Sequence, residues 1–176
     1  ARSGWSHQGV FEIYLDGSQY GEDLWDTLFE AGKDLDVRAG CPNLIERIEA
    51  GLLSYGNDMS IDDTPFESGL AKYCNLDTAT GCLGHPALVE KKHPDRQIRP
   101  LAVAAPAVPP ISWSWPLTDT AGNAAGHVSS ITWSPDFEIN VAIGMVHKDH
   151  WTAGTTLHVQ TPDGPRDAEV RDSFWI

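Results

Sequence analysis

The stretches Val128-Ser-Ser-Ile-Thr-Trp133 and Asn140-Val-Ala-Ile-Gly-Met-Val146 decide the fold of this chain. Both are rich in β-branched and aromatic residues, which favour strands. Two further runs of this kind, residues 155–160 and 168–171, follow, and Pro, Gly and Asn separate the runs. Several short strands at regular spacing predict a small antiparallel β-barrel, which we expect within residues 96–176.

Ahead of the barrel, residues 10–15 alternate in the manner of a strand. The alternation places three residues on the side expected to face the core, namely Phe11, Ile13 and Leu15. Glu12 and Tyr14 share the opposite side, so a carboxylate and a phenol lie next to each other. We expect this pair to face solvent or a pocket.

Two helices are expected after this strand. Apolar residues with helical spacing run from residue 21 to 35, and a second stretch begins at Pro42 or Asn43. The apolar stripe of the second helix consists of Leu44, Ile45, Ile48, Leu52 and Leu53. Gly56 or Asn57 is expected to end that helix.

The sequence between the second helix and the barrel is less regular. Residues 56–72 are polar and turn-rich, and long ordered loops of this sort are often functional. Residues 72–74 are interpreted as a strand, and residues 84–100 as a short helix followed by an interdomain linker. The chain therefore divides into an α/β part, residues 1–95, and an all-β part, residues 96–176, so the fold class is α+β.

Composition argues against several classes of protein. With 25 acidic and 12 basic residues the chain has a formal charge of −13, so we expect no nucleic-acid partner. The longest mostly apolar stretch, residues 101–111, is broken by prolines, so we expect no membrane span. Three cysteines are an odd and sparse number, which favours a reducing, cytoplasmic location over a disulfide framework.

The sequence contains no familiar catalytic or phosphate-binding motif. GxSxG, GxGxxG and GxxxxGK[ST] are absent, and the seven histidines are spread out. Cys74, Cys82 and His85 suggest a metal site, but no CxxC pair supports it. We therefore expect no metal and interpret the cysteines as small buried side chains.

Four side chains are candidates for binding, each with two interpretations. Trp5, in a Gly-flanked loop, either caps the core edge or forms an aromatic wall for a flat or cationic ligand. Glu12 is either solvated or accepts two hydrogen bonds from an amino-pyrimidine edge. Arg47 either pairs with an acid on a solvated helix face or aims at a carboxylate or carbonyl in a cleft. Tyr55 belongs either to the core or to a pocket.

Separated motifs, in order and at plausible spacing, resemble the aminomethyltransferase family, which includes the T protein of the glycine cleavage system. The first is Arg47-Ile-Glu-Ala-Gly-Leu-Leu-Ser-Tyr-Gly-Asn-Asp-Met, followed by Thr64-Pro-Phe-Glu-Ser-Gly-Leu. The later motifs are Gly126-His-Val-Ser-Ser-Ile-Thr-Trp-Ser-Pro and Asn140-Val-Ala-Ile-Gly-Met-Val, with Gly154-Thr and the final Ser-Phe-Trp-Ile.

Further stretches are similar to one branch of this family, the dimethylsulfoniopropionate demethylases. They are Ala1-Arg-Ser-Gly-Trp-Ser-His-Gln-Gly with Phe11-Glu-Ile-Tyr, and Gly40-Cys-Pro-Asn-Leu-Ile-Glu-Arg-Ile-Glu. This resemblance implies methyl transfer from the sulfonium of dimethylsulfoniopropionate to N5 of tetrahydrofolate. The implied products are methylmercaptopropionate and 5-methyltetrahydrofolate, with catalysis mainly by positioning.

The resemblance also implies a fold and a set of site residues. The α/β part would be the remainder of a ferredoxin-like domain. Tetrahydrofolate would be bound by five residues, namely Glu12, Tyr14, Arg47, Tyr55 and Tyr73. Trp5 would line the pocket of the methyl donor, a small molecule.

The resemblance covers nearly the whole chain but about half of the family's usual length. We therefore expect an N-terminal half of the same fold as a partner, with the catalytic residues in that half, and expect the chain alone to be inactive. A chain that begins at Ala1 without an initiator Met agrees with this expectation. The alternatives are another tetrahydrofolate-dependent aminomethyl or methyl transferase, for example of the dimethylglycine type, and a folate-binding module without turnover. A homodimer is left open.

Overall fold

The computed structural model describes residues 9–40 and 43–176. The chain forms two compact units, which divide between Asn43 and Leu44. The predicted division between residues 95 and 96 follows sequence pattern and stays a prediction.

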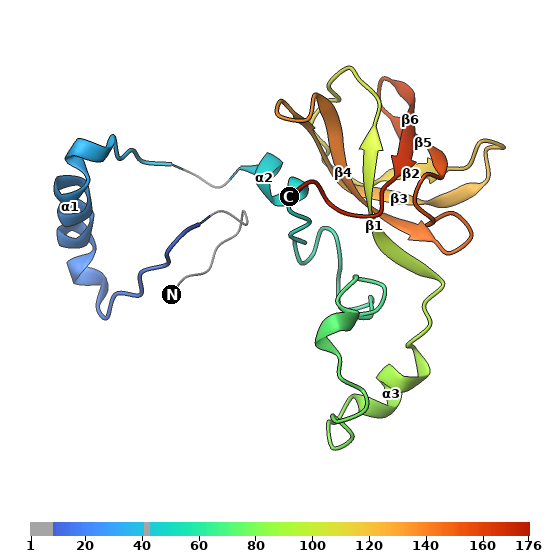
Figure 1. Ribbon diagram of the computed structural model, residues 1–176, viewed down its shortest axis with the longest axis horizontal. Helices are drawn as coiled ribbons and strands as arrows, with labels where there is room; N and C mark the ends of the chain where they lie inside the picture. Colours follow the sequence, from blue (N-terminus) through green and yellow to red (C-terminus); the bar gives the residue numbers. More distant parts are fainter. Residues whose placement is uncertain (1–8, 41–42) are drawn as a thin grey trace. The chain divides into compact units, whose positions relative to one another are not determined.

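The larger unit contains a closed barrel of six antiparallel strands in the order β1-β4-β3-β2-β5-β6 (Figure 1). The strands are β1 (Arg96–Val103), β2 (Trp115–Thr118), β3 (Ala124–Ser134), β4 (Ile139–His147), β5 (Thr156–Thr161) and β6 (Gly164–Val170). The predicted α+β fold with an antiparallel barrel is therefore confirmed. Sequence analysis located β3 to β6 but missed β2, and it assigned part of β1 to a linker.

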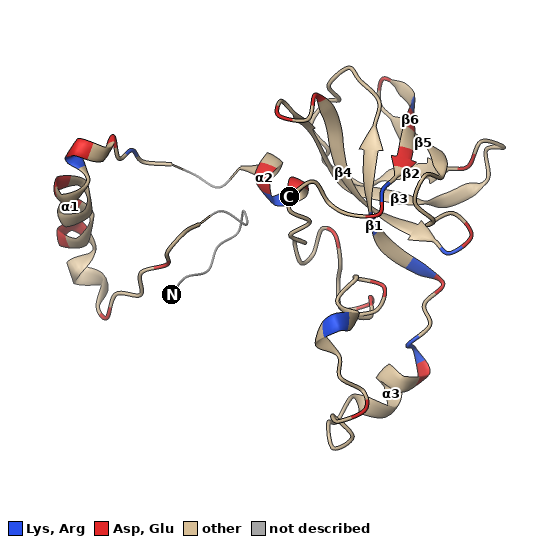
Figure 2. Ribbon diagram, viewed as in Figure 1, with Lys and Arg blue, Asp and Glu red and all other residues tan. Residues whose placement is uncertain are grey.

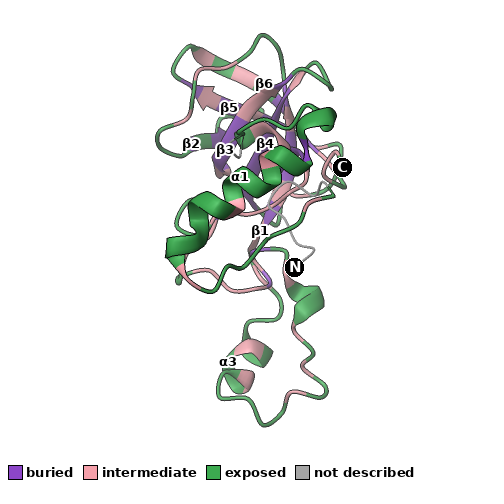
Figure 3. Ribbon diagram, turned by 90° about the vertical axis from the view of Figure 1, so that its left-hand side faces the viewer, coloured by how far each residue is buried: buried purple, intermediate pink, exposed green. Residues whose placement is uncertain are grey.

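Apolar side chains fill the barrel because alternate residues of each strand point inward. Trp115 is the largest side chain in this core, and Leu101, Leu117, Ile131 and Leu157 pack with it, each almost fully buried. In Figure 3 the strands accordingly carry most of the buried surface of the chain.

A second, smaller cluster lies on the outer face of the barrel. The short helix α2 (Leu44–Glu49) packs on β3 and β4 and buries Ile48 against Ile98, Ile143 and Met145. The C-terminal residues fasten this helix, because the backbone N–H of Trp175 donates to the carbonyl of Glu49 at 2.9 Å. The sheet and the C-terminal segment together therefore hold α2 against the barrel.

Three expectations between α2 and the barrel are wrong. The second helix ends at Glu49 and not near Gly56, because the chain turns through Gly51, which has a positive φ of 69°. Residues 72–74 are not a strand, since the 3₁₀ helix η3 covers Ala71–Tyr73. The predicted helix before the barrel exists as α3 (His85–Glu90), but β1 begins at Arg96, inside the expected linker.

The smaller unit consists of helix α1 (Gly21–Ala31) with the 3₁₀ helices η1 (Ser18–Tyr20) and η2 (Lys33–Leu35). The first predicted helix is thus confirmed. The predicted strand over residues 10–15 is wrong, because no described segment pairs with it. Its supposed core residues Phe11, Ile13 and Leu15 are exposed.

Neither of the two described cysteines is buried. Cys82 is exposed and Cys74 is partly exposed, so the prediction of buried cysteines is wrong for both; Cys41 lies outside the described residues. No group of three or more metal-binding side chains that could hold an ion occurs within residues 9–40 and 43–176. No helix in those residues has the length and apolar character that crossing a bilayer requires.

Candidate functional site

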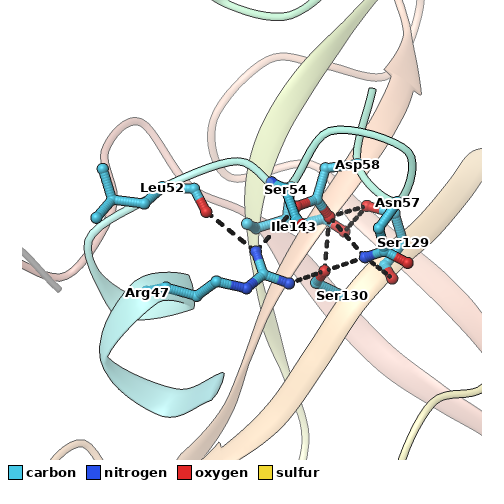
Figure 4. A network of polar contacts seen from close by, with 8 residues as sticks. All are labelled: Arg47, Leu52, Ser54, Asn57, Asp58, Ser129, Ser130 and Ile143. Carbon is cyan, nitrogen blue, oxygen red and sulfur yellow. Dashed lines mark hydrogen bonds and ion pairs between the residues drawn. The ribbon is translucent and has the colours of Figure 1, made fainter. Parts of the chain in front are cut away.

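A buried polar network connects α2, the loop that follows it and strand β3 (Figure 4). Its centre is the ion pair between Arg47 of α2 and Asp58 of the loop, with 2.9 Å between Nη1 and Oδ2. Both side chains are almost inaccessible, at 6% and 0% exposure. A charge this deeply buried is tolerated only when it is paired and hydrogen-bonded, so the two residues depend on each other.

Arg47 uses its terminal nitrogens as a fork. Besides Asp58, Nη1 donates to the carbonyl oxygen of Leu52 at 3.0 Å, and Nη2 donates to Oγ of Ser130 at 2.6 Å. The guanidinium therefore ties its own helix to the following turn and to β3. A lysine has no planar fork and would not reproduce these contacts.

Asp58 accepts hydrogen bonds from both serines of β3, at 2.7 Å from Ser129 and 2.6 Å from Ser130. Adjacent strand residues normally point to opposite faces. A register shift between Val128 and Ser130 opposite β4 interrupts the alternation, so both hydroxyls reach the same carboxylate. The backbone N–H of Ser54 also donates to Asp58, at 2.8 Å.

A cavity of about 310 Å³ borders this network and includes Asn57, Asp58, Arg96 and His127 in its lining. A larger cleft, of about 640 Å³, shares Arg96 and continues toward His147 and Lys148. Residues of the loop 56–67 thus take part in the buried network and also line both open cavities, as expected of a loop that contributes to a binding site.

Arg96 holds the far end of this loop. Its Nη2 lies 2.9 Å from Oδ1 of Asp63, and its Nε lies 2.8 Å from Oε1 of Glu67. Glu67 also accepts the backbone N–H of Thr64 at 2.7 Å. Partial burial raises the pKa of Glu67, but the bonds from Thr64 and Arg96 favour the carboxylate, and the pKa lies below its ordinary value.

His127 faces the same cavity. Burial disfavours its charged form, and the positive charge of Arg96 adds to that effect, so the pKa of His127 lies below its ordinary value of 6.5. The imidazole is therefore neutral at neutral pH.

Neither of the two interpretations that the sequence left open for Arg47 is fully correct. It is buried, so the solvated helix face is wrong. Its guanidinium does point at a carboxylate, but that carboxylate is Asp58 of the same chain. The expected contact of Arg47 with folate stays a prediction.

The two candidate tyrosines of the larger unit lie at the surface. Tyr55 is exposed and precedes Asp58 by three residues; its backbone bridges to Met59. Tyr73 is exposed in η3, where Lys72 Nζ lies 5.1 Å from the centre of its ring. The structure does not gather these two rings around one pocket, and their role stays a prediction.

Glu12 and Tyr14 lie side by side in the smaller unit, although the strand predicted there does not form. The hydroxyl of Tyr14 donates to Oε2 of Glu12 at 3.1 Å. This hydrogen bond and the adjacent negative charge raise the pKa of Tyr14 above its ordinary value of 10.0. Trp5, the candidate for donor binding, lies outside the described residues.

Sequence analysis missed Asp58, Ser129, Ser130 and Arg96. A signal for three of them exists: a pair of serines interrupts the apolar run of β3, and an acidic residue follows Tyr55-Gly-Asn. Their meeting depends on the register shift in β3, which no local pattern reveals.

Sequence models of one family match the chain in two consecutive parts. The model described as the GCVT N-terminal domain matches residues 1–78. The model described as the glycine cleavage T-protein C-terminal barrel domain matches residues 96–175 and so contains all six strands.

Individual relatives agree with these models. The chain is 54% identical over 99% of its length to dimethylsulfoniopropionate demethylase DmdA of Ruegeria pomeroyi, of which it covers 48%. It is 29% identical to an aminomethyltransferase of Acidobacterium capsulatum, over 97% of the chain and 46% of that protein. The crystal structure of the glycine cleavage system aminomethyltransferase T from Bartonella henselae superimposes with a TM-score of 0.67 at 27% identity, over 76% of this chain and 37% of that one. The chain thus spans about half the length of the two relatives compared by sequence.

Proposed function

We propose, for a chain that belongs to the aminomethyltransferase family of the glycine cleavage T protein, that it forms the C-terminal part of a tetrahydrofolate-dependent dimethylsulfoniopropionate demethylase. The observation that carries this proposal is the 54% identity to the Ruegeria pomeroyi demethylase over nearly the whole chain. Identity to the aminomethyltransferase of Acidobacterium capsulatum is about half as high, which favours the demethylase branch.

The proposed reaction moves a methyl group from the sulfonium of dimethylsulfoniopropionate to N5 of tetrahydrofolate. The S–CH₃ bond breaks and leaves its electron pair on sulfur, which becomes the thioether of methylmercaptopropionate. The new N5–CH₃ bond forms as N5 loses its proton. A sulfonium is a good leaving group, so binding both reactants in line supplies most of the rate enhancement.

The residues of this chain suit the binding part of that task. Glu12 offers a carboxylate, and a carboxylate can accept two hydrogen bonds from the amino-pyrimidine edge of a pterin. The hydroxyl of Tyr14 donates a hydrogen bond to Glu12 and so holds one oxygen of its carboxylate in place. In the proposal Arg47, Tyr55 and Tyr73 complete the folate region and Trp5 contacts the sulfonium. The catalytic residues belong to the preceding half of the fold, and the enzyme is cytoplasmic.

Isothermal titration calorimetry with tetrahydrofolate tests the role of Glu12. The experiment uses the complete polypeptide that includes this chain and compares wild type with Glu12→Ala and Glu12→Gln. We expect at least about tenfold weaker binding for both. Glu12→Ala removes both carboxylate oxygens, and Glu12→Gln removes the negative charge and one of the two acceptor oxygens. Asp16→Ala is the matched control, because Asp16 is an exposed acid near the same segment. Equal affinity in Glu12→Ala and wild type refutes the assignment.

A second candidate is an aminomethyl or methyl transfer from an amine such as dimethylglycine. The aminomethyltransferases among the relatives and the Bartonella henselae structure favour it. Product analysis with dimethylsulfoniopropionate and dimethylglycine side by side separates the two. Methylmercaptopropionate alone supports the demethylase, and demethylation of the amine alone supports the second candidate.

A further inference from the structure

We propose that one opening of the barrel is a binding site for a small oxyanion, the carboxylate or phosphate group of a small molecule, held between Arg99 and Arg171. Both arginines line a cavity of about 260 Å³, which three segments of the larger unit enclose: Arg99 of β1, residues 151–153 and residues 171–172. The inference goes beyond the proposed demethylation and is independent of its methyl donor.

Arg99 occupies an inward position on β1. Leu101 and Val103 follow it at intervals of two residues and belong to the barrel core, and alternate strand residues point to the same side. The residue paired with Arg99 on β4 is Gly144, where a Cβ would lie 2.6 Å from a methyl carbon of Leu101. The strand β6 pairs with β1 only over Leu101–Val103, so the closed part of the barrel begins after Arg99. Arg99 therefore lies at an opening of the barrel, where ligands bind in many proteins of this architecture.

Backbone hydrogen bonds bring the other two segments to the same opening. The N–H of Arg171 donates to the carbonyl of Pro100 on β1 at 2.9 Å. The N–H of Gly154 donates to the carbonyl of Val170 at 2.8 Å, which fastens the loop between β4 and β5 beside the end of β6. Trp151 of that loop packs against the barrel core. The cavity is thus built on the sheet and on a loop that the sheet holds in place.

Both guanidinium groups are restrained by a backbone carbonyl and an indole ring. Nε of Arg99 donates to the carbonyl of Trp151 at 3.1 Å, and its guanidinium carbon lies 5.4 Å from the centre of that ring. Nε of Arg171 donates to the carbonyl of Ser173 at 3.3 Å, and its guanidinium carbon lies 4.7 Å from the centre of the Trp175 ring. These contacts leave the terminal N–H groups available, so the two forks are preorganised for an acceptor.

Neither fork is bound to a carboxylate in the part of the chain that the structure describes. Arg38, Arg47 and Arg96 each form an ion pair with an acidic side chain. For Arg99 and Arg171, the described residues supply no such pair and no acceptor for the terminal nitrogens. Acids are not scarce, since the chain has 25 of them and Figure 2 shows them in both units. A guanidinium fork matches a carboxylate or a phosphate group, so the cavity suits an oxyanion.

The charge of the lining also favours an anion. Asp172 is the acid among the described lining residues and is exposed, so two arginines and one aspartate give the lining a net positive charge. Partial burial lowers the pKa of Arg99, and the charge of Asp172 opposes this effect. An oxyanion between the two arginines would compensate their charge where solvent is partly excluded.

The test titrates the 176-residue chain with inorganic phosphate and, in a second arm, with acetate, at fixed ionic strength and without folate or methyl donor. Nuclear magnetic resonance of the arginine Nε–H groups identifies the residues that respond. We expect saturable shifts at Arg99 and Arg171 with one common Kd, and none at Arg166, which lies on β6 outside the cavity lining. Tighter binding of phosphate identifies a phosphate group as the ligand, and tighter binding of acetate identifies a carboxylate.

A substitution that keeps the charge tests the role of the fork. Arg99→Lys retains a cation but loses the planar pair of N–H donors, so it should raise Kd at least about fivefold. Arg166→Ala is the matched control, because it removes an arginine of the same unit outside the cavity lining and should leave Kd unchanged. An Arg99→Lys variant that binds the anion as tightly as wild type overturns the role of the fork.

Asp172→Asn guards against loss of structure as the explanation, because it should improve binding. Removal of this exposed carboxylate takes away a repulsion of the anion and should lower Kd at least about twofold. The proposal is overturned by the absence of saturable shifts at the two arginines in both arms, by equal shifts at Arg166, or by a Kd that does not fall in Asp172→Asn. Because no folate or methyl donor is present, failure of the demethylase assignment leaves this result unaffected.

Discussion

The two units of the chain contain similar apolar patterns, but one buries these side chains and the other leaves them exposed. In the larger unit, a closed sheet buries almost every inward side chain, and α2 adds a second cluster on its outer face. In the smaller unit, an amphipathic helix and an alternating segment leave their apolar side chains exposed. The spacing of apolar residues in the sequence therefore predicts which face of a helix or strand is apolar. Burial of that face also requires a packing partner, which the described residues of the smaller unit do not supply.

The largest effect is expected at the buried ion pair that joins α2 to the barrel. Asp58→Ala leaves the guanidinium of Arg47 buried without its charged partner, which costs about 3–5 kcal/mol. Urea unfolding followed by circular dichroism measures the loss. Asp62→Ala, on the exposed part of the same loop, should change the free energy of unfolding by less than about 0.5 kcal/mol. Similar values for the two variants would contradict the network.

A matched pair of leucines compares the two units directly. Leu157→Ala in the barrel core removes a fully buried side chain and should cost about 2–5 kcal/mol. Leu28→Ala on α1 removes a side chain that is already exposed and should cost less than about 0.5 kcal/mol in this chain by itself. Thermal or urea unfolding of both variants under one condition provides the comparison. If Leu28→Ala is as damaging, the side chain of Leu28 is buried in solution, which contradicts its exposure on α1.

The barrel was predictable because four of its strands, β3 to β6, are short, apolar and separated by turn residues. Its closure through β2 was not visible in the sequence, because closure depends on strand number and register. Part of β1 was assigned to a linker because Pro100 lies inside this strand and proline is common in linkers, although its missing N–H is tolerated there. The buried network was not predictable, since the register shift at Ser129 and Ser130 is set by packing against β4. The pair of Glu12 and Tyr14 was found from alternation alone, even though the strand that the alternation predicted does not form.

A smaller effect is expected at Glu67, which together with Asp63 binds Arg96 and so holds the loop onto β1. The folded-state pKa of Glu67 lies below its unfolded value of about 4.3, so its contribution is present above that pH and declines as pH falls through the folded pKa. Glu67→Gln should therefore reduce stability at pH 7 and flatten the fall in stability in acid. Urea unfolding between pH 7 and 3 measures the free energy of unfolding at pH 7 and its decline as the pH falls. A variant with the same acid profile as wild type would show that Arg96 does not favour the carboxylate.

The smallest effect is a titration in the smaller unit. Glu12→Gln removes the negative charge next to Tyr14, so the pKa of Tyr14 should fall toward its ordinary value of about 10. Nuclear magnetic resonance of the labelled tyrosine ring follows this titration in wild type and variant. No shift at Tyr14 would place the two side chains apart in solution.

Amide hydrogen exchange of the 176-residue chain tests the contrast between the units most directly. Amides of β3 and β4 should exchange only through global unfolding, whereas amides of α1 should exchange nearly as fast as in an unfolded peptide. Equal protection of α1 and the barrel strands in the chain alone would contradict the account.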